Sequence, residues 1–165
     1  FEKFKDKIIY LTFDKEPKGI EEVYENDKLI SFNSKTIQNK KEKFCKLSKK
    51  ENKYFIEGSS YKGFAPEDFI IGTWWNHSII EKNAQISAIS GRIINQKVTF
   101  LGEEEILVGN KKFIALRFNF SSDDNKLSKD KKLNTDVWYD KKNLIWLKAS
   151  FDKKGFWEYR LKKLN

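Results

Sequence analysis

Short apolar runs alternate with polar breaks along almost the whole chain. The breaks include Glu25-Asn26-Asp27-Lys28, Val108-Gly109-Asn110-Lys111 and Asp152-Lys153-Lys154-Gly155. This spacing is typical of an all-β protein in which each strand is followed by its antiparallel neighbour. No long window keeps a 3.6-residue apolar period, so we expect no long helix. We predict a curled antiparallel meander, or half-barrel, of hairpins.

The last hairpin has the most specific pattern. Asp152-Lys153-Lys154-Gly155 fits a type I turn followed by a glycine with positive φ. A one-residue slip would move every side chain to the opposite face, so the apolar alternation specifies the register. The predicted register places three apolar pairs on one core face: Phe151 with Trp157, Ala149 with Tyr159, and Leu147 with Leu161.

The preceding hairpin carries large rings on both faces of the sheet. We expect it to turn at Lys141-Lys142-Asn143, with Asn143 in the left-handed conformation. That turn pairs Tyr139 with Ile145 and Val137 with Leu147 on the core face, and Trp138 with Trp146 on the other. Rings on both faces indicate either a second face covered by loops or a concavity that accepts a ligand.

The segment from Phe64 to Gly91 breaks the strand rhythm. It contains Pro66 and the run Gly72-Thr73-Trp74-Trp75-Asn76-His77. We predict a long connection with one or two short helical turns around residues 66–90. If the sheet forms a concavity, the candidate ligand-binding residues are Trp138, Trp146 and Tyr139, with Trp74 and Trp75 at its mouth.

The net charge of +9 comes almost entirely from lysine. Only Arg92, Arg117 and Arg160 are arginines among 33 basic residues. Nucleic-acid readers favour arginine, whose planar fork grips phosphates and guanine edges. The Lys-Lys pairs also fall in turns at both ends of a meander, so this composition argues against a nucleic-acid partner. No apolar run approaches the ~20 residues of a membrane span.

The sequence offers little for catalysis. Cys45 is the single cysteine and lies in a strand-like run, which indicates a buried structural thiol. His77 is the single histidine, so a His-based acid–base pair and a metal site cannot both be built. Glu103-Glu104-Glu105 reads as a solvated acidic run. No phosphate-binding glycine loop, nucleophile elbow or zinc spacing is present, so we expect no enzyme, no metal and no cofactor.

The order of several short motifs resembles a known family. They are Trp75-Asn76, Gly91, Gly102-Glu103, Val108-Gly109, Ala115-Leu116-Arg117-Phe118, Val137-Trp138-Tyr139-Asp140, Leu144-Ile145-Trp146-Leu147, Gly155 and Tyr159-Arg160-Leu161. This order resembles an uncharacterised family of exported proteobacterial proteins, classed as a domain of unknown function. Its members end in W-Y-D, a short turn, an apolar strand, a glycine turn and Y-x-L. The resemblance covers most of residues 20–164.

The resemblance implies a periplasmic or secreted protein of a Gram-negative bacterium. It also implies a curled sheet loosely similar to periplasmic lipoprotein carriers, which shelter acyl chains, and it carries over no catalytic residue. Family members have a further N-terminal hairpin, which we expect this chain to lack. The chain contains no Met and begins at Phe1, so we expect a processed or trimmed product. We expect residues 1–165 to form a single β domain.

Three functions remain open at this point. The favoured one is binding of a lipid, another apolar ligand or an envelope partner in the concavity. The second is an assembly module in which the missing hairpin leaves a sheet edge open to strand addition from a partner protein. The third is polyanion binding through the surface lysines.

Overall fold

The structure is a computed structural model, and it describes residues 8–12, 19–38, 40–153 and 155–163. It confirms an all-β fold of antiparallel hairpins. The first strands are β1 (Ile8–Thr12), β2 (Gly19–Glu25), β3 (Lys28–Gln38), β4 (Lys41–Lys50), β5 (Lys53–Gly58), β6 (Lys62–Pro66) and β7 (Ile70–Ile71). The later strands are β8 (Ala84–Ile86), β9 (Ile93–Val108), β10 (Lys111–Ser122), β11 (Asn134–Asp140), β12 (Trp146–Asp152) and β13 (Phe156–Arg160).

In the part of the chain that the structure describes, two connections between strands contain short helical turns. The 3₁₀ turn η1 (His77–Glu81) lies within the predicted helical region, and η2 (Lys129–Lys131) follows β10. Asn76 caps η1, because its Oδ1 accepts the Ser78 N–H at 3.1 Å. Among the described residues, no helix has the length and apolarity needed to cross a membrane.

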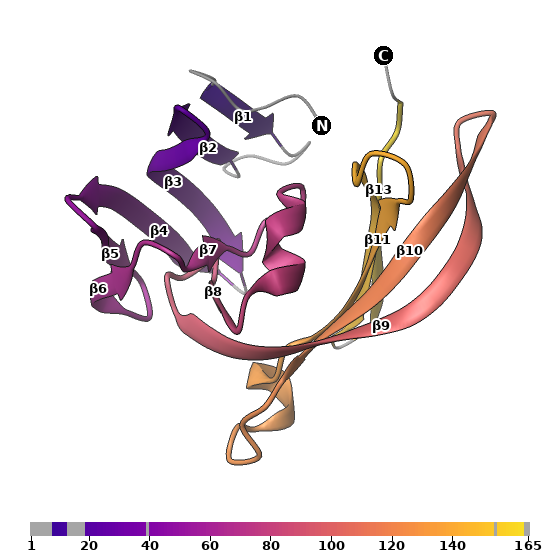
Figure 1. The fold of residues 1–165 in the computed structure, drawn as a ribbon. Coiled ribbons are helices and arrows are strands. Elements are labelled where there is room, and N and C mark those ends of the chain that lie inside the picture. Colours follow the sequence, from indigo (N-terminus) through magenta and orange to yellow (C-terminus); the bar gives the residue numbers. More distant parts are fainter. Residues whose placement is uncertain (1–7, 13–18, 39, 154, 164–165) are drawn as a thin grey trace. The chain divides into compact units, whose positions relative to one another are not determined.

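The chain folds into two compact units, each built from separate segments. Unit 2 contains the chain up to Gly72 together with Ile86–Ile93, and unit 1 contains Thr73–Gln85 and the chain from Ile94 onward. The expectation of a single domain stays a prediction. In unit 2, six strands follow the order β1-β2-β3-β4-β5-β6. In unit 1, the order β13-β12-β11-β10-β9 is again a meander, in which β9 and β10 form a long curved pair (Figure 1).

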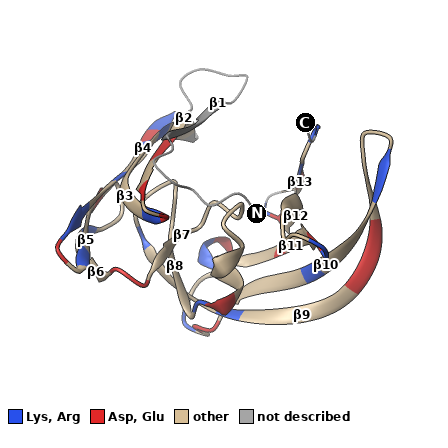
Figure 2. Ribbon diagram, turned by 45° about the horizontal axis from the view of Figure 1, so that its top comes forward, with Lys and Arg blue, Asp and Glu red and all other residues tan. Residues whose placement is uncertain are grey.

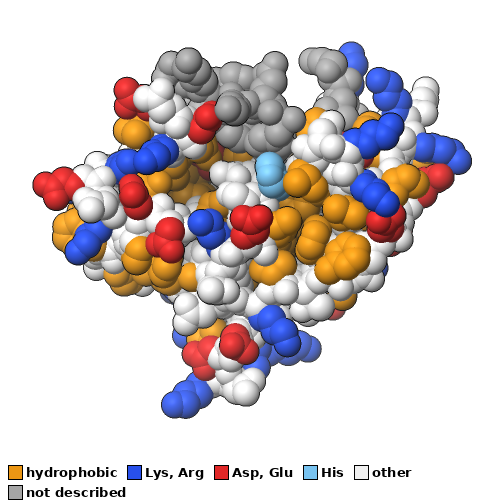
Figure 3. All heavy atoms as spheres, in the orientation of Figure 1, with side chains coloured by type: hydrophobic (Ala, Val, Ile, Leu, Met, Phe, Trp, Pro, Cys, Tyr) orange, Lys and Arg blue, Asp and Glu red, His pale blue; other side chains and the backbone are white. Residues whose placement is uncertain are grey.

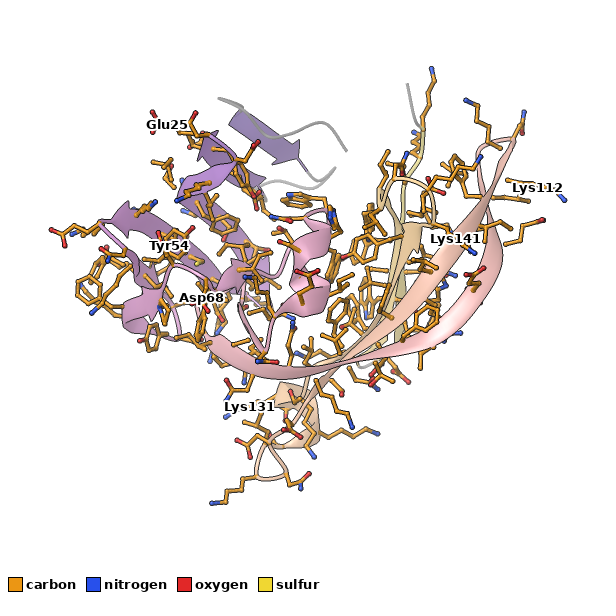
Figure 4. The ribbon with its side chains drawn as sticks, viewed as in Figure 1. Glu25, Tyr54, Asp68, Lys112, Lys131 and Lys141 are labelled. Atoms are coloured by element: carbon orange, nitrogen blue, oxygen red, sulfur yellow. The ribbon has the colours of Figure 1, made fainter. Side chains whose placement is uncertain are left out.

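The core of unit 2 lies on one face of its sheet. Phe32, Leu47 and Ile56 stand in line across β3, β4 and β5, and each is at most 3% exposed. Figure 4 labels Tyr54 among the side chains of this unit, and its hydroxyl donates to the Leu29 carbonyl at 3.2 Å. The return segment Ile86–Ile93 covers this face, with Ile86 fully buried.

Cys45 is the structural thiol that the sequence predicts. Its side chain is fully buried in the core of unit 2. Burial raises the pKa of the Cys45 thiol from its ordinary value of 9.0 to about 12, because the thiolate loses its hydration there. The protein therefore holds Cys45 as a neutral, unreactive group at pH 7.

The last hairpin has the predicted register. Phe151 stands opposite Trp157 and Ala149 opposite Tyr159, while the Leu161 N–H donates to the Leu147 carbonyl at 2.8 Å. Gly155 has the predicted positive φ, at 123°. The expected burial is wrong at the outer strand, because β13 is the edge of the sheet. Trp157 is 52% exposed there, and its indole N–H donates to the Lys153 carbonyl at 3.2 Å.

The predicted pairing of the preceding hairpin is wrong. Tyr139 stands opposite Trp146 rather than Ile145, and Trp138 stands opposite Lys148 rather than Trp146. The register shifts between Trp138 and Tyr139, so the simple alternation fails at this point. As a result, Val137 pairs with Ala149 and not with Leu147.

The cause of this shift is the local chemistry of the turn. Asn143 does not take the left-handed conformation; Leu144 does, with a φ of 57°. The Asn143 side chain acts instead, because its Oδ1 accepts the Ile145 N–H at 3.1 Å. The turn therefore runs one residue further than predicted, and β12 begins only at Trp146.

Candidate functional site

Every strand from β9 to β13 contributes at least one aromatic side chain to the same face of the unit 1 sheet. Directly opposed residues share a face, and so do residues two apart along a strand. The pairs Phe100–Phe118, Phe118–Val137, Val137–Ala149 and Ala149–Tyr159 link the five strands by this rule. We call this surface the aromatic face, and it comprises Phe100, Phe118, Tyr139, Phe151, Tyr159 and, from the connection before η1, Trp74.

The first three rings form a continuous row from β9 to β11. The centroids of Phe100 and Phe118 lie 5.4 Å apart, and those of Phe118 and Tyr139 lie 6.3 Å apart. Both distances are within the range of favourable aromatic pairs. Tyr139 is fully buried, whereas Phe100 at the end of the row is 55% exposed. The row thus runs from the buried ring of Tyr139 to the solvent-exposed ring of Phe100.

The other three rings form a second cluster. Trp74 packs against Phe151 at 6.4 Å and against Tyr159 at 6.0 Å, and Phe151 stacks on Tyr159 at 6.1 Å. The Tyr139 hydroxyl donates to the Trp74 carbonyl at 2.6 Å. This hydrogen bond connects the row to the cluster.

Trp74 adopts a backbone conformation that bulky residues rarely take. Its φ is 70°, in the left-handed region that normally favours glycine. Such a conformation costs about 1–3 kcal/mol and persists only where other contacts hold it. Here the hydrogen bond from Tyr139 and the packing on Phe151 and Tyr159 hold it, so the fold places this ring over the sheet at an energetic cost.

The rings at the two ends of the aromatic face are open to solvent. Phe100 is 55% exposed and Tyr159 is 39% exposed. Figure 3 shows hydrophobic side chains gathered to the right of the single histidine, over unit 1. Exposed rings at the two ends of an otherwise packed apolar face are candidate contacts for a ligand.

The structure brings together some of the residues singled out from the sequence. Trp74 and Tyr139 meet on the aromatic face through the hydrogen bond from the Tyr139 hydroxyl to the Trp74 carbonyl. Trp146 stands opposite Tyr139, and its indole nitrogen is buried with no hydrogen-bond partner in the described part of the chain. Trp75 is half-buried, and its N–H donates to the Thr73 carbonyl at 3.0 Å.

Trp138 lies apart from these residues, on the opposite face of the sheet. Its ring is 3% exposed and lies between two cations, with Lys148 Nζ at 3.9 Å from the centroid and the Arg117 guanidinium at 4.9 Å. Its indole N–H donates to a Glu104 carboxylate oxygen. Arg117 also donates to Asp136 at 3.0 Å. The ring is fully engaged by its own chain, so we leave it out of the candidate site.

Four residues of the aromatic face were not singled out as ligand-binding from the sequence. Phe151 and Tyr159 were predicted on the same face as Tyr139, but as core residues. Phe118 could have been found from the alternation of Leu116, Phe118 and Phe120 along one strand. Phe100 could not, because a register shift at Gly102 separates it from the residues that follow on β9.

The polar chemistry of unit 1 does not gather at the aromatic face. Burial lowers the pKa of the His77 imidazole below its ordinary value, so His77 is neutral at pH 7. Within the described residues, no group of three or more His, Cys, Asp or Glu side chains could hold a metal ion. The chemistry of the face is therefore that of apolar contact.

A shallow depression lies in the other unit. It has a volume of about 510 Å³ at the β4–β5 turn and is lined by Lys50, Glu51, Asn52, Lys53 and Phe64. None of the residues proposed from the sequence lines it. Its walls are mainly polar turn residues, so it lacks the apolar lining of a typical small-molecule site.

Comparison with known protein families identifies residues 17–162 as DUF6134, a domain of unknown function. The chain belongs to the DUF6134 family. This agrees with the resemblance to an uncharacterised family noted from the order of its motifs. No curated protein and no solved structure matches the chain. As a DUF6134 protein, it receives from its family no assigned ligand or reaction, so its function has to be argued from its own side chains.

Proposed function

We propose that this DUF6134 protein is a non-enzymatic binding protein whose aromatic face holds a long apolar ligand, such as an acyl chain. The observation that carries the proposal is the series of aromatic rings with one member on each of five consecutive strands. Strands lie about 4.8 Å apart, so the series extends over about 19 Å. A surface this long, narrow and apolar suits a chain-like ligand better than a compact one.

The gradient of exposure supports the same proposal. Tyr139 is fixed by burial and by its bond to the Trp74 carbonyl, while Phe100 and Tyr159 at the two ends remain partly exposed. A ligand lying along the face would cover the exposed ends and gain about 25 cal/mol for each Å² of apolar surface removed from water. The anchored centre would need no rearrangement, which keeps the entropic cost of binding low.

We expect Phe100→Ala to weaken binding of the fluorescent apolar probe N-phenyl-1-naphthylamine about tenfold, since it removes an exposed ring at one end of the face. Phe64→Ala is the matched control. Phe64 is also 55% exposed and also packs against a single ring, that of Phe55 at 5.2 Å, but it lies on β6 of unit 2. Titrations followed by probe fluorescence give both dissociation constants.

Equal effects of the two substitutions would refute the aromatic face as the site. Native mass spectrometry of the purified protein supplies a second test, because a bound lipid would appear as a defined added mass. Thermal unfolding of both variants shows whether the fold is intact. A weaker probe affinity in Phe100→Ala with an unchanged unfolding temperature supports the proposal.

A periplasmic or secreted location in a Gram-negative bacterium forms part of the same proposal. It rests on the resemblance of the motif order to exported proteins. An apolar carrier would act in an envelope compartment, where lipids must cross water between two membranes. Cell fractionation with an antibody against the protein tests this point.

A second candidate function is strand addition from a protein partner, and the edge strand β13 favours it. All five of its residues are exposed, with Phe156 72% and Trp157 52% exposed. An exposed edge with large apolar side chains is a template for pairing with another strand. Light scattering over a concentration series should then show self-association that Phe156→Lys abolishes. Ile37→Lys on β3, where Ile37 is 42% exposed, is the control, and a strict monomer would count against self-pairing.

A further inference from the structure

One side of β9 has no strand partner along most of its length, within the part of the chain that the structure describes. In the sheet order β9 lies between β10 and β8, and β8 has only three residues. The Gln96 N–H donates to the carbonyl of Asn83, the residue before β8, at 2.9 Å, so β8 accompanies only the start of β9. We call residues 97–108 the outer edge of β9. Backbone N–H and C=O groups at alternate positions of this edge point away from β10.

The outer edge is exposed and partly apolar. Figure 1 shows β9 on the outside of the long curved pair that it forms with β10. Phe100 is 55%, Leu101 49% and Leu107 54% exposed. The register with β10 shifts at Gly102, so the regular part of the edge is residues 103–108, about 20 Å of strand. A strand edge of this kind is a template for pairing with another strand.

Three consecutive glutamates give the outer edge its charge. They are Glu103, Glu104 and Glu105, which lie within the red band on β9 in Figure 2. Glu103 and Glu105 share one face of the strand, whereas Glu104 shares the other with Ile106 and Val108. Like charges that oppose one another across strands are destabilising. The triplet therefore disfavours an acidic strand, and it also disfavours a second copy of this edge, which would bring three more carboxylates into the ladder.

The present partners of the triplet all lie on the inner side of β9. Three ion pairs, at 2.7, 3.8 and 3.0 Å, join Glu103 to Lys141, Glu104 to Arg117 and Glu105 to Lys112. Exposed pairs of this kind contribute little to stability, and they leave the outer side of each carboxylate open to a further partner. Because these bases neutralise the triplet at longer range, selection of an added strand depends on the side chains directly opposite the glutamates.

We propose that residues 103–108 of β9 pair with an extended segment of a partner protein in which basic and apolar side chains alternate. The basic side chains would oppose the two glutamates that share a face with Leu107, and their aliphatic stems would cover Leu107. The apolar side chains would lie beside Ile106 and Val108 and extend their buried cluster. This inference goes beyond the proposed ligand binding, and it concerns a different edge from β13.

The test is titration of the full chain into fluorescently labelled peptides, followed by anisotropy. A peptide of strictly alternating lysine and valine should bind at least about tenfold more tightly than the same peptide with glutamate in place of lysine. The protein carries a net charge of +9, so non-specific attraction would favour the acidic peptide instead. A third peptide has proline in place of valine. It keeps the charge but cannot form the ladder hydrogen bonds, so it should not bind.

Glu103→Lys with Glu105→Lys should reverse this preference, so that the lysine–valine peptide binds about tenfold more weakly and the acidic peptide more tightly. The matched control is Glu25→Lys with Glu51→Lys, which makes the same change of net charge at exposed positions of unit 2. Figure 4 labels Glu25. Thermal unfolding of both double variants shows whether each is folded.

Each outcome decides the proposal. Reversal in the first double variant alone, with no binding of the proline peptide, supports it. Equal change in both variants would mean that net charge drives binding, and unchanged binding in both would place the peptide elsewhere, such as on β13. Either result overturns the proposal. The comparison of the three peptides uses the unaltered protein, so equal or tighter binding of the acidic or proline peptide overturns it even where a variant fails to fold. The probe test at Phe100 is separate, so either proposal can fail while the other stands.

Discussion

Gly58→Ala should destabilise unit 2 by about 3 kcal/mol or more, although it adds a single methyl group. A Cβ at this position would lie 2.3 Å from the Ser90 carbonyl oxygen and 2.9 Å from the Gly91 Cα, both backbone atoms of the segment that covers the core. Overpacking against backbone that cannot move aside costs at least as much as overpacking among side chains. The Ser90 carbonyl also accepts the Ser60 N–H at 3.0 Å, and a displaced carbonyl would lose that bond.

Gly109→Ala provides the matched control. Gly109 has a φ of 59°, but a Cβ there would meet no atom within 4 Å. Gly109→Ala should therefore lower the free energy of unfolding only by the cost of the left-handed backbone conformation, about 1 kcal/mol. Urea unfolding followed by alkylation of Cys45 reports on unit 2. A smaller effect at Gly58 than at Gly109 would show that the covering segment can shift away from the sheet.

Raising the pH from 8 to 11 should lower the free energy of unfolding by about 3–5 kcal/mol, because three buried acids hold their protons in the folded state. Burial raises the pKa of Cys45 from 9.0 to about 12 and the pKa of Tyr54 from 10.0 to about 12, and it raises that of Tyr139 further. These groups make their full contribution to the stability of the folded state at pH values below the pKa values that they have in the unfolded chain. Their contribution is lost as pH rises through 9 and 10, by about 1.4 kcal/mol per group and pH unit.

Urea unfolding at a series of pH values measures this slope. Tyr54→Phe removes one of the three titrating groups, so the variant should lose about 1.4 kcal/mol less than the parent between pH 8 and 11. At every pH the variant also loses the hydrogen bond from the Tyr54 hydroxyl to the Leu29 carbonyl, which lowers its free energy of unfolding by a constant amount. A free energy of unfolding that stays constant up to pH 11 would contradict the buried, protonated state of these groups.

The final hairpin could be predicted from sequence because its pattern is local. Phe151, Ala149 and Leu147 alternate on one strand, a glycine closes the turn, and only one register puts the apolar residues together. The preceding hairpin has the same alternation but a different turn. There the Asn143 side chain takes over a backbone hydrogen bond, and Leu144 adopts the positive φ that a leucine rarely takes. Propensity favours Asn143 for that conformation, so the sequence pattern misplaced the turn by one residue.

The candidate site was predictable only in part, for a similar reason. Trp74 and Tyr139 were both predicted as candidate ligand-binding residues, and the structure brings them into contact. Their meeting depends on a hydrogen bond across 65 residues and on the positive φ of Trp74, neither of which has a local signal. The predicted pairing of Trp138 with Trp146 was wrong because a single shift in register changes which residues oppose one another along a strand. The burial of Trp138 between Arg117 and Lys148 likewise depends on partners from other strands.

The division of the chain between its two units has a consequence for how the fold can be inherited. Unit 2 is complete only when Ile86–Ile93 is in place, yet the chain has by then already contributed Thr73–Gln85 to unit 1. No single cut therefore separates the units. Recombination at one point would deliver a sheet without the residues that cover its core, such as Ile86 and Ala88. A single crossover therefore cannot transfer either unit alone from one protein to another.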